Sequence, residues 1–129
     1  MADWQVLEAK QTVLVVEDDV LVRMHGVDIL EDAGFTVLEA ETADEAITLL
    51  QGQEDVHLLF SDIDMPGSMN GLELAQLVRD RWPKVRLLLT SGHHHIEEEA
   101  LPEHGRFVRK PWTRERLIAT IQATLDSGA

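Results

Sequence analysis

Short runs of apolar, often β-branched residues alternate along this chain with longer amphipathic stretches, and this alternation limits the possible fold more than any other feature. The first run, residues 12–16, reads Thr-Val-Leu-Val-Val and leads into a stretch of helical length. Continuous apolar runs are typical of strands buried on both faces, and amphipathic helices cover such strands in βα units. We count five units and predict an α/β fold, with an open, doubly wound parallel sheet of five strands and five helices.

Turn and capping residues set the expected boundaries of these elements. Gly34 lies where one helix would end, and Pro83 follows the end of another. Thr42 and Glu45 form a candidate capping box, and Thr113 is a candidate N-cap. The strands are expected at residues 12–16, 35–39, 56–61, 85–90 and 106–109, and the helices at residues 20–33, 43–50, 71–81, about 96–101, and 114–125.

Length and composition indicate one domain with few classes of partner. At 129 residues the chain fits a single domain, expected over residues 12–126 after a lead-in at residues 1–11. The absence of cysteine excludes disulfides, thiolate metal sites and a cysteine nucleophile. With 11 basic and 24 acidic residues the net charge is −13, so we expect neither nucleic acid nor an anionic membrane as a partner. No apolar run is long enough to span a bilayer, and we expect a cytoplasmic protein.

Acidic residues follow two of the predicted strands, at the edge where doubly wound sheets bind their ligands. Glu17, Asp18 and Asp19 come directly after the first strand, and Asp62 and Asp64 follow the third. Neighbouring carboxylates repel each other and Mg²⁺ prefers oxygen ligands, so this group predicts a magnesium site. The alternative is a set of loop acids before a helix, with Asp19 as the N-cap. A carboxylate beside a bound cation can also attack phosphorus, which makes Asp62 a candidate nucleophile.

The fourth and fifth predicted strands end in groups suited to a phosphoryl oxygen. Thr90 and Ser91 carry hydroxyls, and Lys110 carries a mobile positive charge. Each is weak evidence alone, because threonine often caps helices and lysine is common on surfaces. Together the four strands supply a metal site, a nucleophile, a hydroxyl donor and a cation, which is the set that phosphoryl transfer requires.

Four short motifs occur in order along the chain: Leu-Val-Val-Glu-Asp-Asp, Ser-Asp-Ile-Asp-Met-Pro, Leu-Leu-Leu-Thr-Ser-Gly and Val-Arg-Lys-Pro-Trp. Their order and spacing resemble those of the receiver domains of bacterial response regulators, over nearly the whole chain. The resemblance implies the flavodoxin-like strand order 2-1-3-4-5. It also implies that Asp62 accepts a phosphoryl group, which Thr90 and Lys110 contact.

The same resemblance implies a magnesium cofactor at the acidic edge of the sheet. Asp18 would bind Mg²⁺ directly and Glu17 through water. Asp62 and the backbone carbonyl of Asp64 would complete the set of protein ligands.

A conformational switch and a set of partners are implied as well. Phe107 resembles the switch aromatic that responds to movement of Thr90, and the Lys110–Pro111 peptide bond is expected to be cis. The phosphodonor would be a histidine kinase or a histidine phosphotransfer protein. A downstream protein would bind the face of the fourth helix, fifth strand and fifth helix. The implied protein is a stand-alone phosphoacceptor without an output domain, and it is not an enzyme beyond its own phosphorylation and dephosphorylation.

Several residues depart from the family pattern. Asp64 is ionisable where many relatives carry a neutral side chain, and Trp112 stands where phenylalanine is more frequent. Phe107 lacks the hydroxyl of a tyrosine, which excludes switching by a hydrogen bond from that ring. The histidines at 93–95 and the glutamates at 97–99 match no metal motif, and we expect a solvated loop there.

Two other functions are open at this point. The run Asp62-Ile63-Asp64 imitates the nucleophile motif of aspartate-dependent phosphatases of the haloacid dehalogenase type, but that family places the motif on its first strand. A binding module on a receiver scaffold that no longer uses phosphate is the second alternative, which the complete set of site residues opposes. Within the favoured hypothesis, shuttling phosphate, draining it and acting directly on an effector all stay open.

Overall fold

The computed structural model describes residues 10–52 and 55–126 of the chain. The lead-in expected at residues 1–11 falls almost entirely on residues 1–9, which lie outside the described residues. The elements are β1 (Thr12–Val16), α1 (Val20–Asp32), β2 (Thr36–Ala40), α2 (Ala43–Gly52), β3 (Val56–Asp62), α3 (Gly71–Arg81), β4 (Arg86–Ser91), β5 (Arg106–Arg109) and α4 (Arg114–Asp126).

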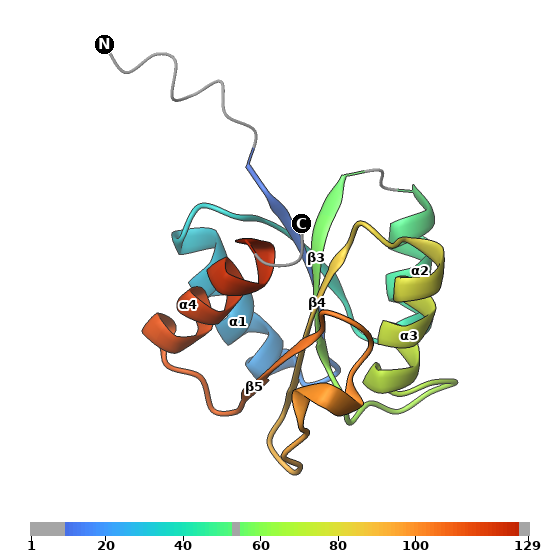
Figure 1. The fold of residues 1–129 in the computed structure, drawn as a ribbon. Helices are drawn as coiled ribbons and strands as arrows, with labels where there is room; N and C mark the ends of the chain where they lie inside the picture. Colours follow the sequence, from blue (N-terminus) through green and yellow to red (C-terminus); the bar gives the residue numbers. More distant parts are fainter. Residues whose placement is uncertain (1–9, 53–54, 127–129) are drawn as a thin grey trace.

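The strands form one parallel sheet between two layers of helices. Its strand order is β2-β1-β3-β4-β5. Figure 1 shows α1 and α4 on one face of the sheet and α2 and α3 on the other. The predicted fold class and strand order are confirmed.

Two apolar clusters, one on each face, hold the layers together. Along β1, Val13 and Val15 face the cluster under α1 and α4, whereas Leu14 and Val16 face the cluster under α2 and α3. These four side chains are at most 2% exposed, which explains why the run shows no alternation between apolar and polar residues. The same alternation of faces continues along β4, so its last two residues, Thr90 and Ser91, face opposite sides of the sheet.

The prediction of a helix at about residues 96–101 is wrong. Only a single 3₁₀ turn, Glu98–Ala100, forms in the segment between β4 and β5. Short helices depend on burying an apolar face, and in this segment Leu101 is the one buried hydrophobic residue. The described residues therefore contain four α-helices, and α4 is the helix expected at residues 114–125.

Helix α1 begins close to the acidic loop after β1. Asp19 is its N-cap, because its Oδ1 accepts hydrogen bonds from the backbone amides of Leu21 and Val22 at 2.9 and 3.1 Å. Asp19 thus has the structural role that was the alternative to metal binding.

No helix in the described part of the chain is long and apolar enough to cross a membrane. The expected cytoplasmic location stays a prediction.

Candidate functional site

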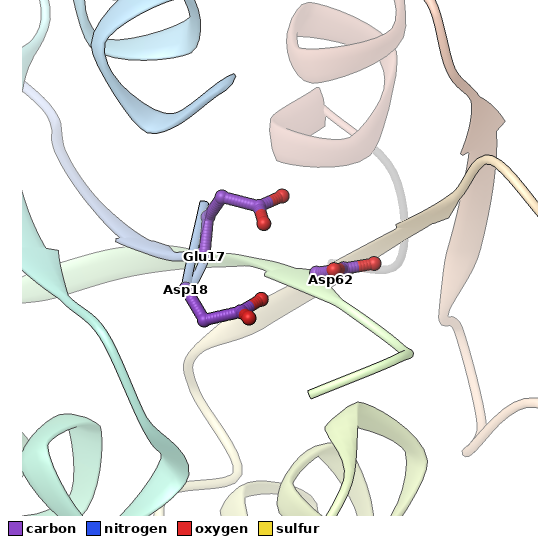
Figure 2. A group of neighbouring side chains, drawn as sticks. All are labelled: Glu17, Asp18 and Asp62. Atoms are coloured by element: carbon purple, nitrogen blue, oxygen red, sulfur yellow. The ribbon is translucent and has the colours of Figure 1, made fainter. Parts of the chain in front are cut away.

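Three carboxylates meet where β1 and β3 end side by side. Val16 pairs with Ser61, so Glu17 and Asp62 follow paired residues on neighbouring strands. One oxygen each of Glu17, Asp18 and Asp62 lies within 4.8 Å of the other two, and Figure 2 shows the three side chains close together at the ends of β1 and β3. Glu17 is 3% exposed and Asp62 is 5% exposed, whereas Asp18 is open to solvent. The group borders a cavity of about 340 Å³.

Lys110, which follows β5, brings a positive charge to the buried carboxylates. Its Nζ lies 2.7 Å from Glu17 Oε1 and 3.4 Å from Asp62 Oδ2. The peptide bond between Lys110 and Pro111 is cis. The lysine also lines the cavity beside the three acids, so that the groups expected at the ends of β1, β3 and β5 lie together.

Burial controls the ionisation of this group. It raises the pKa of Glu17 above the ordinary value of 4.5, and the hydrogen bond from Lys110 offsets only part of the rise. Burial also raises the pKa of Asp62 above 3.8, again with a partial offset from the charge of Lys110. Burial alone would lower the pKa of Lys110, but the hydrogen bond to Glu17 and the charge of Asp62 raise it above 10.5.

These residues fit a divalent cation. Carboxylate oxygens are the ligands that Mg²⁺ prefers, and crowded carboxylates with raised pKa values gain from a nearby positive charge. Among the residues that the structure describes, no other group of His, Asp or Glu side chains is placed to hold a metal ion. The histidines at 93–95 and the glutamates at 97–99 do not form such a group.

The side chain of Asp64 lies at the edge of the cavity, beside Asp62. Its backbone amide donates to Asp62 Oδ1 at 3.3 Å, and its own Oδ2 accepts a hydrogen bond from Ser91 Oγ at 2.7 Å. His94 Nδ1 lies 3.2 Å from Asp64 Oδ1. Although burial acts in the opposite direction, the Ser91 hydrogen bond and His94 lower the pKa of Asp64 below 3.8. Asp64 is therefore an anion with two partners.

The structure places Thr90 differently from the expectation. Its hydroxyl accepts a hydrogen bond from Trp112 Nε1 at 3.0 Å, within the buried cluster under α1 and α4. Successive residues of a strand face opposite sides of a sheet, so Ser91, one residue later, faces the other way and bonds to Asp64. The hydroxyl held beside the acidic cavity is that of Ser91. Residue order alone could not separate these two adjacent hydroxyls.

Trp112 uses the N–H that a phenylalanine would lack. The ring is buried, stacks on His25 at a centroid distance of 6.0 Å and packs against Phe60 at 5.2 Å. A Cβ on Gly26 of α1 would lie 3.2 Å from the indole, so the glycine makes room for the larger ring. Trp112 thus ties β4 to α1.

Phe107 lies on the Ser91 side of the sheet. It pairs with Leu89 of β4 and packs, half-buried, against the cluster under α2 and α3. Its ring meets His95 edge-on at a centroid distance of 5.9 Å. Thr90 faces the opposite cluster, so the side chains of Thr90 and Phe107 lie on opposite faces of the sheet.

A parallel sheet whose carboxyl edge carries paired acids, an aspartate and a lysine has the parts of a magnesium-dependent phosphoryl site. Comparison with known proteins gives the same class, because residues 13–122 match the family model of the response regulator receiver domain. The chain belongs to this family, whose members are signalling domains of two-component systems that histidine kinases phosphorylate.

Curated relatives and solved structures agree with the assignment. The sensor kinase CckA of Brucella abortus is 34% identical over 128 residues, which cover 93% of this chain and 13% of that protein. The nitrogen assimilation regulatory protein NtrX of Azorhizobium caulinodans is 31% identical over 119 residues, covering 89% and 26%. The chain thus spans between 13% and 26% of the length of these two relatives. The chemotaxis protein CheY4 of Vibrio cholerae has a TM-score of 0.79 at 26% identity, covering 90% of this chain and 99% of that one.

Proposed function

We propose that this receiver domain accepts a phosphoryl group on Asp62 from a histidine kinase or a histidine phosphotransfer protein. The observation that carries the proposal is the position of Asp62. It is nearly buried, it lies within 4.8 Å of Glu17 and Asp18, and its Oδ2 is 3.4 Å from Lys110 Nζ. No other carboxylate in the described chain lies between this acidic pair and a lysine.

Transfer to Asp62 needs no external base. A carboxylate oxygen forms a new bond to phosphorus while the bond from phosphorus to the donor's histidine nitrogen breaks, and the freed imidazole takes a proton from solvent. Lys110 lies where it can offset the charge of the acyl phosphate. Asp18, Glu17 through water, Asp62 and the Asp64 carbonyl would hold Mg²⁺, which when bound neutralises charge on the transferred group. We assign the hydroxyl contact to Ser91 in place of Thr90.

Acetyl phosphate tests the acceptor. With Mg²⁺ it should label the protein on Asp62, and Asp62→Asn or removal of Mg²⁺ should reduce labelling at least about 100-fold, because nucleophile and charge neutralisation are both required. Intact-mass spectrometry measures the label, and Asp44→Asn, an exposed acid on α2, serves as the control. Full labelling of Asp62→Asn would refute the assignment. Steady hydrolysis of small phosphate esters would favour the phosphatase alternative.

We propose that the output surface consists of residues 92–105, β5 and α4. This surface replaces the one expected with a fourth helix, since that segment holds only a 3₁₀ turn. Phe107 lies on the Ser91 side of β4 and is the candidate aromatic that responds to Ser91. In protein phosphorylated with acetyl phosphate, NMR chemical-shift changes should extend from Asp62 to Phe107. Changes confined to the residues of the acidic cavity would contradict a signal that passes from Ser91 to Phe107.

The exposed apolar side chains of α1 are the proposed docking site for the phosphodonor. Val20, Leu21 and Met24 are 50%, 76% and 53% exposed, which is unusual for large hydrophobic residues. Leu21 also lines an apolar pocket of about 250 Å³ whose walls include Lys110 and Trp112. Because Lys110 borders both this pocket and the acidic cavity, a protein bound to α1 would lie beside Asp62.

Leu21→Asp tests this docking site. We expect transfer from a donor protein to slow by about tenfold or more, since interface hydrophobic anchors cost on the order of 1–2 kcal/mol or more when lost. Phosphorylation by acetyl phosphate should stay within about twofold of wild type, because the small donor needs no docking surface. The measurement is the rate of transfer from purified phosphorylated histidine kinases, with Gln76→Asp on α3 as the control. An equal loss with both donors would refute the docking role.

A further inference from the structure

The Ser91 hydroxyl has no free hydrogen-bonding capacity in this structure. A serine hydroxyl offers one proton and accepts two hydrogen bonds. The proton is donated to Asp64 Oδ2 at 2.7 Å, and the oxygen accepts from the backbone amides of His93 and His94 at 3.1 and 3.0 Å. A phosphoryl oxygen on Asp62 can receive the Ser91 proton only if Asp64 gives it up.

Asp64 is a strong competitor for that proton. Its Oδ2 lies only 2.7 Å from Ser91 Oγ, and hydrogen bonds to carboxylate acceptors are shorter and stronger than those to neutral ones. Its other oxygen is held by His94 Nδ1 at 3.2 Å, which keeps the carboxylate turned toward Ser91. The two amides that donate to Ser91 are those of His93 and His94 in the loop after β4. This loop, Ser91 and Asp64 are therefore joined by hydrogen bonds into one group.

We infer that Asp64 is a positioning residue that opposes activation, because it competes with the phosphoryl group for the hydroxyl proton of Ser91. This inference rests on the proposed function of Asp62. The unphosphorylated arrangement is the one with the Asp64–Ser91 bond intact. On phosphorylation, Ser91 exchanges Asp64 for a phosphoryl oxygen, and Asp64 keeps His94 as its partner.

A simpler effect must be separated from this one. Asp64 carries a negative charge beside Asp62, and that charge alone repels a phosphoryl group. Repulsion does not depend on Ser91, whereas competition requires the Ser91 hydroxyl. A double-mutant cycle between the two residues therefore distinguishes them.

The cycle measures the dissociation constant of beryllofluoride, a phosphoryl mimic, with Mg²⁺ by calorimetry. We expect Asp64→Ala to tighten binding by about tenfold when Ser91 is present, and by less than about threefold in Ser91→Ala, where only repulsion is relieved. Asp64→Asn keeps an oxygen that accepts from Ser91 but is uncharged, so it should give an intermediate gain. Equal gains in both backgrounds, or equal gains for Ala and Asn, would overturn the inference.

Two further results keep the inference apart from the proposed function. If beryllofluoride with Mg²⁺ binds none of the proteins, wild type included, the proposed function fails.

Thr90→Val is the matched control for Ser91→Ala, because it removes the neighbouring hydroxyl. It should leave the dissociation constant within about twofold, although the loss of the acceptor for Trp112 Nε1 should lower the stability of the protein. A loss of binding in Thr90→Val as large as in Ser91→Ala would overturn the assignment of the hydroxyl.

Discussion

Gly71→Ala will lower the free energy of unfolding by about 3 kcal/mol or more, although alanine is the better helix former. Gly71 is the first residue of α3, where its amide donates to the carbonyl of Ile63 at 2.9 Å. A Cβ at this position would lie 2.0 Å from the backbone oxygen of Asp62 and 2.8 Å from the Cα of Ile63. Both are backbone atoms, so no side-chain rotation relieves the contact. The close approach of α3 to the end of β3 therefore requires glycine.

Urea denaturation measures this effect, and Gly52→Ala is the matched control. A Cβ on Gly52, the last residue of α2, would meet no atom within 4 Å, so we expect a change within about 1 kcal/mol. Because the contact is with Asp62 itself, Gly71→Ala should also slow labelling by acetyl phosphate in the fraction that stays folded. An unfolding free energy like that of wild type would show that α3 can move away from β3 at little cost.

Lys110→Met will remove the positive charge that partners the two buried carboxylates. Without Mg²⁺ near pH 7 we expect a loss of stability of about 2–4 kcal/mol, because breaking a buried ion pair leaves an uncompensated charge. Phosphorylation of Asp62 should slow on the order of 100-fold, as for other lost donors to a developing anion. Arg109→Met is the control, because it removes the same charge from the exposed neighbouring residue. It should change the stability and the rate of phosphorylation little.

The loss of stability should depend on pH in a defined direction. Burial raises the pKa of Glu17 and of Asp62 in the folded protein, and without Lys110 both rise further. A group whose pKa is raised by folding stabilises the protein below its unfolded pKa, and that contribution is lost as pH rises through the folded pKa. The difference between wild type and Lys110→Met should therefore be small near pH 4 and grow toward pH 7. Mg²⁺ should reduce it, and a difference independent of pH would contradict this account.

The sequence by itself determined the layers of the fold and the acidic site. Five short apolar runs that alternate with amphipathic stretches required a parallel sheet covered by helices, and parallel strands bring their carboxyl ends to one edge. Glu17, Asp18, Asp62 and Lys110 each lie at the end of a strand or within two residues of it, so local sequence was sufficient to place them together.

Tertiary packing decided the segment between β4 and β5. The sequence of residues 96–101 predicted a short helix, but Leu101 is its one buried hydrophobic residue and Ile96 is only partly buried, so a single 3₁₀ turn forms. Helix formation over so short a span depends on such packing rather than on local preference.

Tertiary structure also decided which hydroxyl bonds to Asp64 at the edge of the acidic cavity. Thr90 and Ser91 are adjacent and chemically alike, and a shift of one residue reverses the face of the sheet that a side chain meets. Trp112 takes Thr90 as its hydrogen-bond acceptor on one face, and Asp64 takes Ser91 on the other. Neither partner is close in sequence, so only the register of β4 against its neighbours and the packing of the indole under α1 determine the arrangement.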